Sequence, residues 1–241
     1  LKKIISLSSL PIFMSYHFNP QAFLNMLVNG VKLNYDDYAA IIASRSSDPF
    51  KLLIMTILSQ NTNDKNAIKA YSNLSSKYDV NAKTLSKISP VELAELIKPA
   101  GLHFNRANRI IALSKIILEN YNSDLNNILN LPCDVARRIL LSLPGIGLKT
   151  VDVLLLFTGR CAIFPVDTHI TRVSKRLGVV DVKAKYKDIQ SFWMKNYPES
   201  EYLRLHLLLI ALGREFCSAR NPKHNICPVR FMCKTWFQIS F

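Results

Sequence analysis

Apolar residues recur along almost the whole chain with the three-to-four-residue spacing of amphipathic helices. The strict alternation of apolar and polar positions that indicates half-exposed strands is not evident. Ser89, Pro90 and Glu92 stand in the order that begins a helix, with a cap, a proline and an acid. The pattern predicts an all-α chain of about ten helices. The main predicted helices cover 49–58, 64–74, 90–97, 105–119, 134–142, 148–158, 168–177, 186–196 and 202–213.

Positive charge is spread over the whole sequence. The 241 residues include 31 Lys and Arg against 17 Asp and Glu, a net charge of +14, and both halves are basic. Such a chain usually meets a polyanion, either nucleic acid or an anionic membrane, although it could also be merely cationic. No uncharged apolar run reaches 18 residues, and no helix has the one-sided basic face with aromatic anchors of a membrane-surface protein. Nucleic acid is therefore the favoured partner.

The first residues resemble a secretory signal but lack a small-residue cleavage site. Met14 opens a more natural start than Leu1, which a non-standard start codon or a start placed too far upstream would explain, so residues 1–13 are left out of the fold prediction. The chain that follows has the character of an intracellular protein. We therefore expect it in the cytoplasm, at the nucleoid.

A glycine-containing turn joins two of the predicted helices. In Leu143-Pro-Gly-Ile-Gly147, Pro144 ends the first helix, and Gly145 and Gly147 permit backbone angles closed to other residues. Without side chains at the two glycines, a phosphate could approach the free N–H groups that begin the next helix. Such a contact does not read base sequence. The alternative is an ordinary tight turn.

Lys149 and Asp167 are the candidate catalytic pair. A lysine in the first turn of a helix is poorly placed for stability, because the helix dipole disfavours a cation there. The same field, together with a dry pocket, would lower the pKa of Lys149 and provide a nucleophilic amine. An acid nearby would raise that pKa, so the two influences compete. Asp167 precedes an apolar-periodic run and is placed as an N-cap, while the nearby His169 could be a DNA contact or an ordinary core-edge imidazole.

The segments LPGIGLKT and VDTHITRVSKRLG together resemble the helix-hairpin-helix DNA glycosylase superfamily, and specifically its endonuclease III branch. The resemblance runs from about Phe50 to Cys233. It implies a two-domain all-α fold with a DNA-binding groove between the domains. The expected division is a six-helix domain at 43–161 and a second helical domain formed by 14–42 plus 162–241.

The resemblance also implies an activity. In this family a damaged base is flipped out of the duplex, and Lys149 would attack C1′ of its sugar with help from Asp167, first releasing the base and then cutting the strand. We therefore expect a bifunctional DNA glycosylase and abasic-site lyase that removes oxidised pyrimidines, acting as a monomer on damaged double-stranded DNA. The alternatives are a mismatch uracil/thymine or 8-oxoguanine glycosylase on the same fold, or a non-catalytic DNA-binding module.

Further DNA contacts follow from matching this family residue by residue. Gln60 matches a glutamine that enters the gap left by the flipped base, and Leu102 matches a second wedge. His103 stands where relatives commonly have tyrosine, so lesion preference could differ. Several arginines and lysines could reach phosphates or be solvated helix charges. They are Arg106, Arg109, Arg172, Lys175 and Arg176.

A C-terminal set departs from the family pattern. The family's cluster loop has the spacing C-x6-C-x2-C-x5-C, and Cys217, His224, Cys227 and Cys233 keep all three spacings with histidine at the second position. The set could bind a [4Fe–4S] cluster with His224 as fourth ligand, bind zinc as a Cys3His site, or hold no metal. Two further cysteines, at positions 133 and 161, are expected to be small buried apolar residues rather than a disulfide.

Overall fold

The computed structural model describes residues 18–240, and every regular element in that range is a helix. The predicted all-α class is confirmed, with fourteen α-helices where about ten were predicted. The difference comes mainly from helices of four to seven residues, which are too short to show an apolar period. Residues 1–13 and Met14 lie outside the described range. The helices are α1 (Pro20–Gly30), α2 (Ala39–Ser44), α3 (Pro49–Leu58), α4 (Asp64–Lys77), α5 (Ala82–Leu85), α6 (Pro90–Ile97), α7 (His103–Tyr121), α8 (Asn126–Leu129), α9 (Cys133–Ser142), α10 (Leu148–Phe157), α11 (Thr168–Leu177), α12 (Tyr186–Asn196), α13 (Tyr202–Glu215) and α14 (Lys234–Ser240).

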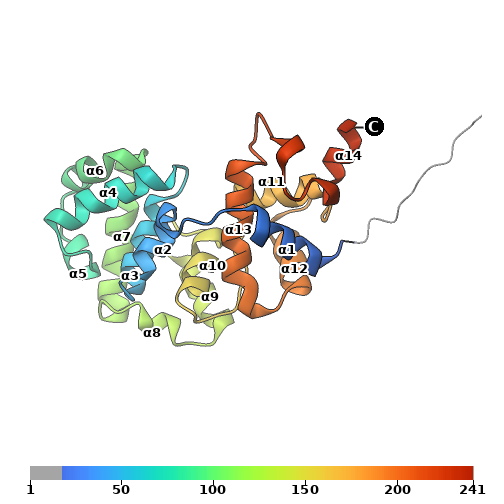
Figure 1. Ribbon diagram of the computed structural model, residues 1–241. Coiled ribbons are helices and arrows are strands. Elements are labelled where there is room, and N and C mark those ends of the chain that lie inside the picture. The colour runs from blue at the N-terminus through green and yellow to red at the C-terminus, as the bar shows by residue number, and fades with distance from the viewer. Residues whose placement is uncertain (1–17, 241) are drawn as a thin grey trace, which may run out of the picture.

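The helices pack around two hydrophobic cores (Figure 1). The first core is built by α2–α10, and the second by α1 together with α11–α13 and the C-terminal segment. Helices α10 and α13 touch where the two cores meet, and Phe157 packs against both cores. The first core begins at Ala39, ahead of the predicted boundary at residue 43. We propose that each core defines one domain.

Local signals set the helix starts. Ser89 Oγ accepts a hydrogen bond from the Glu92 N–H at 3.2 Å, so the predicted cap of α6 is confirmed. The Glu92 carboxylate turns away from the cap and accepts hydrogen bonds from Lys77 and Tyr78 instead. Asp48 caps α3 in the same manner through the N–H of Phe50 at 2.8 Å. These caps fix where each helix enters its core.

A buried carboxylate joins the two cores behind the hairpin. Asp152 on α10 is fully buried and accepts hydrogen bonds from Arg137 at 2.8 Å, Tyr186 at 2.7 Å and Gln190 at 2.7 Å. Arg137 belongs to α9, whereas Tyr186 and Gln190 belong to α12. A buried charge is tolerated when it is paired and fully hydrogen-bonded, as this one is. The bonds fasten the hairpin helices to the second core.

The expectation that Cys133 and Cys161 are unpaired apolar residues was wrong, because their sulfurs form a disulfide. Cys133 opens α9 and Cys161 follows α10, with 28 residues of sequence separation between them. The two helices run back along each other, which brings the Cα atoms to 5.8 Å, within disulfide range. Linear spacing could not show this pairing. The disulfide closes the open end of the hairpin.

Reduction of this disulfide is expected to lower the free energy of unfolding by about 3 kcal/mol, because it releases a closed loop of intermediate length in the unfolded chain. The measurement is thermal unfolding with and without a phosphine reductant. A Cys133→Ser variant serves as control and should not respond to the reductant. An unfolding midpoint that is the same in oxidised and reduced protein would contradict this role.

Within residues 18–240, no helix has both the length and the apolar character that crossing a membrane requires.

Candidate active site and DNA interface

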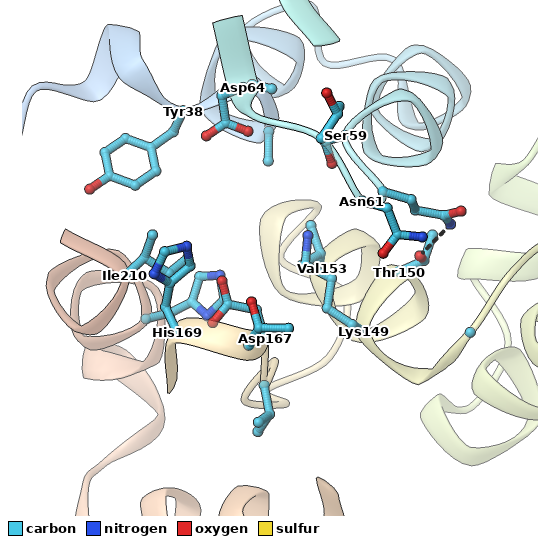
Figure 2. Close-up of a pocket in the computed structure, with 18 of the residues that line it drawn as sticks. Tyr38, Ser59, Asn61, Asp64, Lys149, Thr150, Val153, Asp167, His169 and Ile210 are labelled. Atoms are coloured by element: carbon cyan, nitrogen blue, oxygen red, sulfur yellow. Dashed lines mark hydrogen bonds between the residues drawn. The ribbon is translucent and has the colours of Figure 1, made fainter. Parts of the chain in front are cut away.

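A pocket of about 740 Å³ lies where the two cores meet (Figure 2). The first core contributes the start of α2, the loop after α3, the start of α4, the hairpin and α10, while the second contributes the start of α11 and one face of α13. The pocket brings together six residues singled out from the sequence. They are Gln60, Gly145, Gly147, Lys149, Asp167 and His169.

Lys149 lies in the first turn of α10, partly buried in the pocket wall. Burial lowers the pKa of its amine, while the negative charges of Asp167 and Asp64 act in the opposite direction and Arg214 adds to the lowering. The competition expected from the sequence is therefore present, and burial prevails. A lowered pKa increases the fraction of neutral, nucleophilic amine near neutral pH.

Asp167 occupies the N-cap of α11. Its Oδ1 accepts a hydrogen bond from the Ile170 N–H at 2.8 Å, which confirms the predicted cap. The carboxylate also lines the pocket, and its charge acts on the amine of Lys149 and on the rings of His169 and His206. The capping hydrogen bond fixes the position of the Asp167 carboxylate. Its second oxygen makes no capping bond and is free to interact with groups in the pocket.

The hairpin has its expected geometry at Gly145 but not at Gly147. Gly145 has φ +77°, in the left-handed region, and a Cβ there would lie 2.9 Å from Cδ of Arg109. Gly147 differs, because its φ of −110° is open to any residue and a Cβ at this position would meet nothing within 4 Å. Among the described residues no side chain caps the N-terminus of α10. Its first N–H groups are thus available to an anion such as a DNA phosphate.

Two exposed apolar side chains stand at the start of α7. Leu102 adopts the left-handed region at φ 50° and is 63% exposed, and Phe104 is 53% exposed. The ring of His103 lies against that of Phe104, with centroids 4.7 Å apart. An exposed leucine on a constrained backbone has the character expected of a wedge.

Arg106 differs from its expected place as a surface charge. It is 5% exposed and donates hydrogen bonds to the backbone carbonyls of Ala100, Gly101 and Gln60. The helical period predicts a place on the outer face of α7, but the loops before α4 and α7 fold over the side chain. It is therefore not placed to contact a phosphate.

The side chain of Gln60 is held by the hairpin. Its Nε2 donates to the Gly145 carbonyl at 3.1 Å and to Thr150 Oγ1 at 3.0 Å, the latter drawn as a dashed line in Figure 2. The next residue, Asn61, is exposed and has φ 54°. Entry of Gln60 into DNA would break both hydrogen bonds, whereas Asn61 stands at the tip of the loop.

His169 and Arg172 pack α11 against α13. Arg172 donates to the carbonyls of Cys217 at 2.7 Å and Gly213 at 2.9 Å, and its Nη2 lies 3.0 Å from Nδ1 of His169. Burial lowers the pKa of His169 against the opposing charge of Asp167, and Arg172 lowers it further. These hydrogen bonds show that Arg172 holds α11 against α13. Its contact with a DNA phosphate stays a prediction.

The pocket also contains residues that the sequence patterns did not assign to it. Arg214 on α13 pairs with Asp64 of α4 at 2.6 Å and lies over the ring of Tyr38, 4.9 Å from its centroid. Burial raises the pKa of Tyr38 to about 12. In the same pocket, burial lowers the pKa of His206 to about 4, and its Nδ1 lies 3.1 Å from the Pro165 carbonyl. No local pattern links these residues, which lie far apart in the sequence.

The four C-terminal candidates line one small cavity. Cys217, His224, Cys227 and Cys233 all face it, and Arg176 donates to Cys217 Sγ at 3.4 Å. Burial raises the pKa of Cys227 to about 11. Three thiols and an imidazole are the soft donors that suit an iron–sulfur cluster or zinc, so the donor chemistry fits. Within the described residues, however, no three such groups are arranged to hold a single metal ion.

Comparison with known proteins assigns the chain to a family. A family model described as HhH-GPD superfamily base excision DNA repair protein matches residues 54–199, and the chain belongs to this superfamily. It is similar to Endonuclease III of Sulfolobus acidocaldarius, with 35% identity over 204 residues, 81% of this chain and 86% of that protein. It is also similar to Endonuclease III of Thermotoga maritima, with 32% identity over 190 residues, 79% of this chain and 84% of that protein.

Solved structures of DNA glycosylases have the same fold as this chain. A trapped endonuclease III–DNA covalent intermediate superposes with a TM-score of 0.78 at 28% identity, covering 93% of this chain and 100% of that one. A thermostable thymine-DNA glycosylase shares the fold, with a TM-score of 0.75 at 21% identity, covering 91% of this chain and 97% of that one. The expected helix-hairpin-helix glycosylase fold is confirmed.

Proposed function

We propose that the protein is a DNA glycosylase with abasic-site lyase activity that removes oxidised pyrimidines from duplex DNA. The observation that carries this proposal is the joint presence of Lys149 and Asp167 in one pocket, next to a hairpin whose N–H groups are open to a phosphate. DNA binding alone needs the hairpin but not the pair. The related endonuclease III structures with DNA support duplex DNA as the partner. Action on DNA would place the protein at the nucleoid.

The pair carries the chemistry as follows. The neutral Lys149 amine forms a bond to C1′ of the damaged nucleotide as the bond from C1′ to the base breaks, and the base leaves with the electron pair and takes up a proton. O4′ then leaves C1′ with a proton from the nitrogen, which opens the sugar and gives a protonated Schiff base. Loss of a proton from C2′ expels the 3′ phosphate and cuts the strand. The Asp167 charge stabilises positive charge on the sugar throughout.

The surface around the pocket binds the DNA. The N–H groups at the start of α10 receive a backbone phosphate without reading sequence. Leu102 and the loop after α3 enter the space vacated by the flipped nucleotide. Because Gln60 is tied to the hairpin, we assign the gap-filling role to Asn61 in place of Gln60.

The damaged base itself is read in the pocket, and the substrate class is tested by offering alternatives. Duplexes carrying an oxidised pyrimidine, a uracil or thymine mismatch, or 8-oxoguanine are compared for base release and strand cleavage. We expect cleavage to be fastest on the oxidised pyrimidine. Preferential release from a mismatch or from 8-oxoguanine would select the other glycosylase activities on this fold, and binding without release from any of them would favour a DNA-binding module.

We further propose that Cys217, Cys227 and Cys233, with His224 as fourth ligand, hold a [4Fe–4S] cluster. Such a cluster would supply a rigid centre to which the C-terminal loop is fastened. In and beside that loop Arg220, Lys223, Arg230 and Lys234 add positive charge that suits a DNA backbone, whereas Arg214 is paired with Asp64 in the large pocket.

The protein purified without oxygen is expected to contain iron and acid-labile sulfide in equal amounts, and His224→Ala is expected to lose most of both. Metal analysis and visible absorption provide the measurement, and they do not depend on activity. A Lys223→Ala variant controls for a change at the neighbouring position. Zinc without sulfide would identify a Cys3His zinc site instead, and the absence of any metal would show that packing alone holds the loop.

A further inference from the structure

One buried cation joins the two loops that approach DNA. Arg106, in the first turn of α7, donates from Nη1 to the carbonyls of Ala100 at 2.7 Å and Gly101 at 2.6 Å, and from Nη2 to the carbonyl of Gln60 at 2.5 Å. Burying a charge costs free energy unless its hydrogen bonds are satisfied, and these partners are neutral carbonyls rather than a carboxylate. The arrangement therefore has a geometric result, which is a fixed separation between the two loops.

The connection continues to the catalytic helix. Gln60 accepts from Arg106 through its carbonyl and donates through its side chain to Gly145 and Thr150. Thr150 follows Lys149 directly on α10. The loop at 98–102, the loop at 59–63 and the hairpin thus form one hydrogen-bonded unit beside the nucleophile.

Both loops present a strained residue at an exposed position. Asn61 has φ 54° and Leu102 has φ 50°, and a non-glycine residue in this region persists only where its surroundings hold it. Both are exposed, while the bonds that hold their loops converge on the buried guanidinium. The same Arg106 side chain therefore holds the backbone of both the Asn61 loop and the Leu102 loop.

We propose that Arg106 is a positioning residue that keeps the Asn61 and Leu102 loops in register with Lys149, so that both loops enter the base stack together as the nucleotide is displaced. Flipping a paired base out of the duplex costs free energy, because its stacking is lost. If the two loops shifted during this step, C1′ would not come within bonding distance of the Lys149 amine. This inference rests on the proposed function. It assigns Arg106 no contact with DNA.

The residue type supports the assignment. The guanidinium is a rigid planar fork with five N–H donors, which can face carbonyls on two loops at once. A lysine at this position keeps the charge but concentrates its donors on one small ammonium group. Arg106→Lys should therefore keep the charge and lose the bridge, while Arg106→Met removes both.

The test compares cleavage at an oxidised pyrimidine in duplex DNA, whose base must be flipped out, with cleavage at an abasic site in an isolated single strand, where no base pair has to be opened. We expect Arg106→Met to slow duplex cleavage by about tenfold or more while single-strand cleavage stays within about twofold of wild type. Arg106→Lys should fall between wild type and the methionine variant on duplex DNA. Lys115→Met, an exposed change on the same helix, controls for loss of one positive charge.

The outcomes separate the two proposals. Equal losses on duplex and single strand would mean that Arg106 only stabilises the fold, and thermal unfolding of each variant would show this directly. Duplex cleavage that is unchanged in both variants would also overturn the positioning role. A wild-type protein that cleaves neither substrate would overturn the lyase function and this inference with it, whereas active wild-type protein with insensitive variants would overturn this inference alone.

Discussion

Replacing Lys149 with alanine is expected to reduce cleavage at abasic sites by about three orders of magnitude or more while leaving affinity for duplex DNA nearly unchanged. Removing a covalent nucleophile eliminates the route that passes through the enzyme–DNA bond, and residual rates then come from binding and electrostatics alone. Affinity persists because the hairpin N–H groups and the spread positive charge are untouched.

The measurement pairs single-turnover cleavage with a binding assay on the same abasic duplex. Lys115→Ala on α7 is a suitable control, since it removes an equal charge from an exposed position outside the pocket. Cleavage that survives in Lys149→Ala at the wild-type rate would show that another group attacks C1′. Loss of binding in parallel with cleavage would make Lys149 a DNA contact rather than the nucleophile.

Asp167→Asn is expected to slow the same reaction by about a hundredfold or more, which is the usual scale for a lost proton-transfer or charge-stabilising group. Asparagine is as good an N-cap as aspartate, so α11 should keep its hydrogen bond to Ile170 and the protein its stability. The substitution therefore removes the charge and leaves the cap.

The pH dependence gives this variant a second signature. Asp167 raises the pKa of Lys149 against the effect of burial, so its removal should lower that pKa further. The amine would then be neutral at lower pH, and the alkaline rise of the cleavage rate should shift towards acid even as the maximum rate falls. Turnover equal to wild type with an unshifted profile would reduce Asp167 to a cap.

Local sequence signals account for the hairpin, the candidate pair of Lys149 and Asp167, and the main helices. Gly145 and Gly147, the lysine after them and the capping aspartate lie in short segments where spacing determines geometry. Such features could be predicted because they depend on neighbours along the chain.

Features that depend on distant segments could not be predicted in this way. The burial of Arg106 is set by two loops that fold over it, and the pairing of Arg214 with Asp64 joins residues 150 positions apart. The disulfide likewise arises from the return path of two helices. Composition and helical period contain no information about contacts between segments that are distant in the sequence.

The most direct test of the account is borohydride trapping on a duplex that contains one oxidised pyrimidine. Borohydride reduces the Schiff base to a stable amine, so the account predicts a covalent protein–DNA product that forms with wild-type protein and disappears in Lys149→Ala. Base release and tight binding without any trapped product would contradict the lysine mechanism and indicate a glycosylase that uses water as its nucleophile.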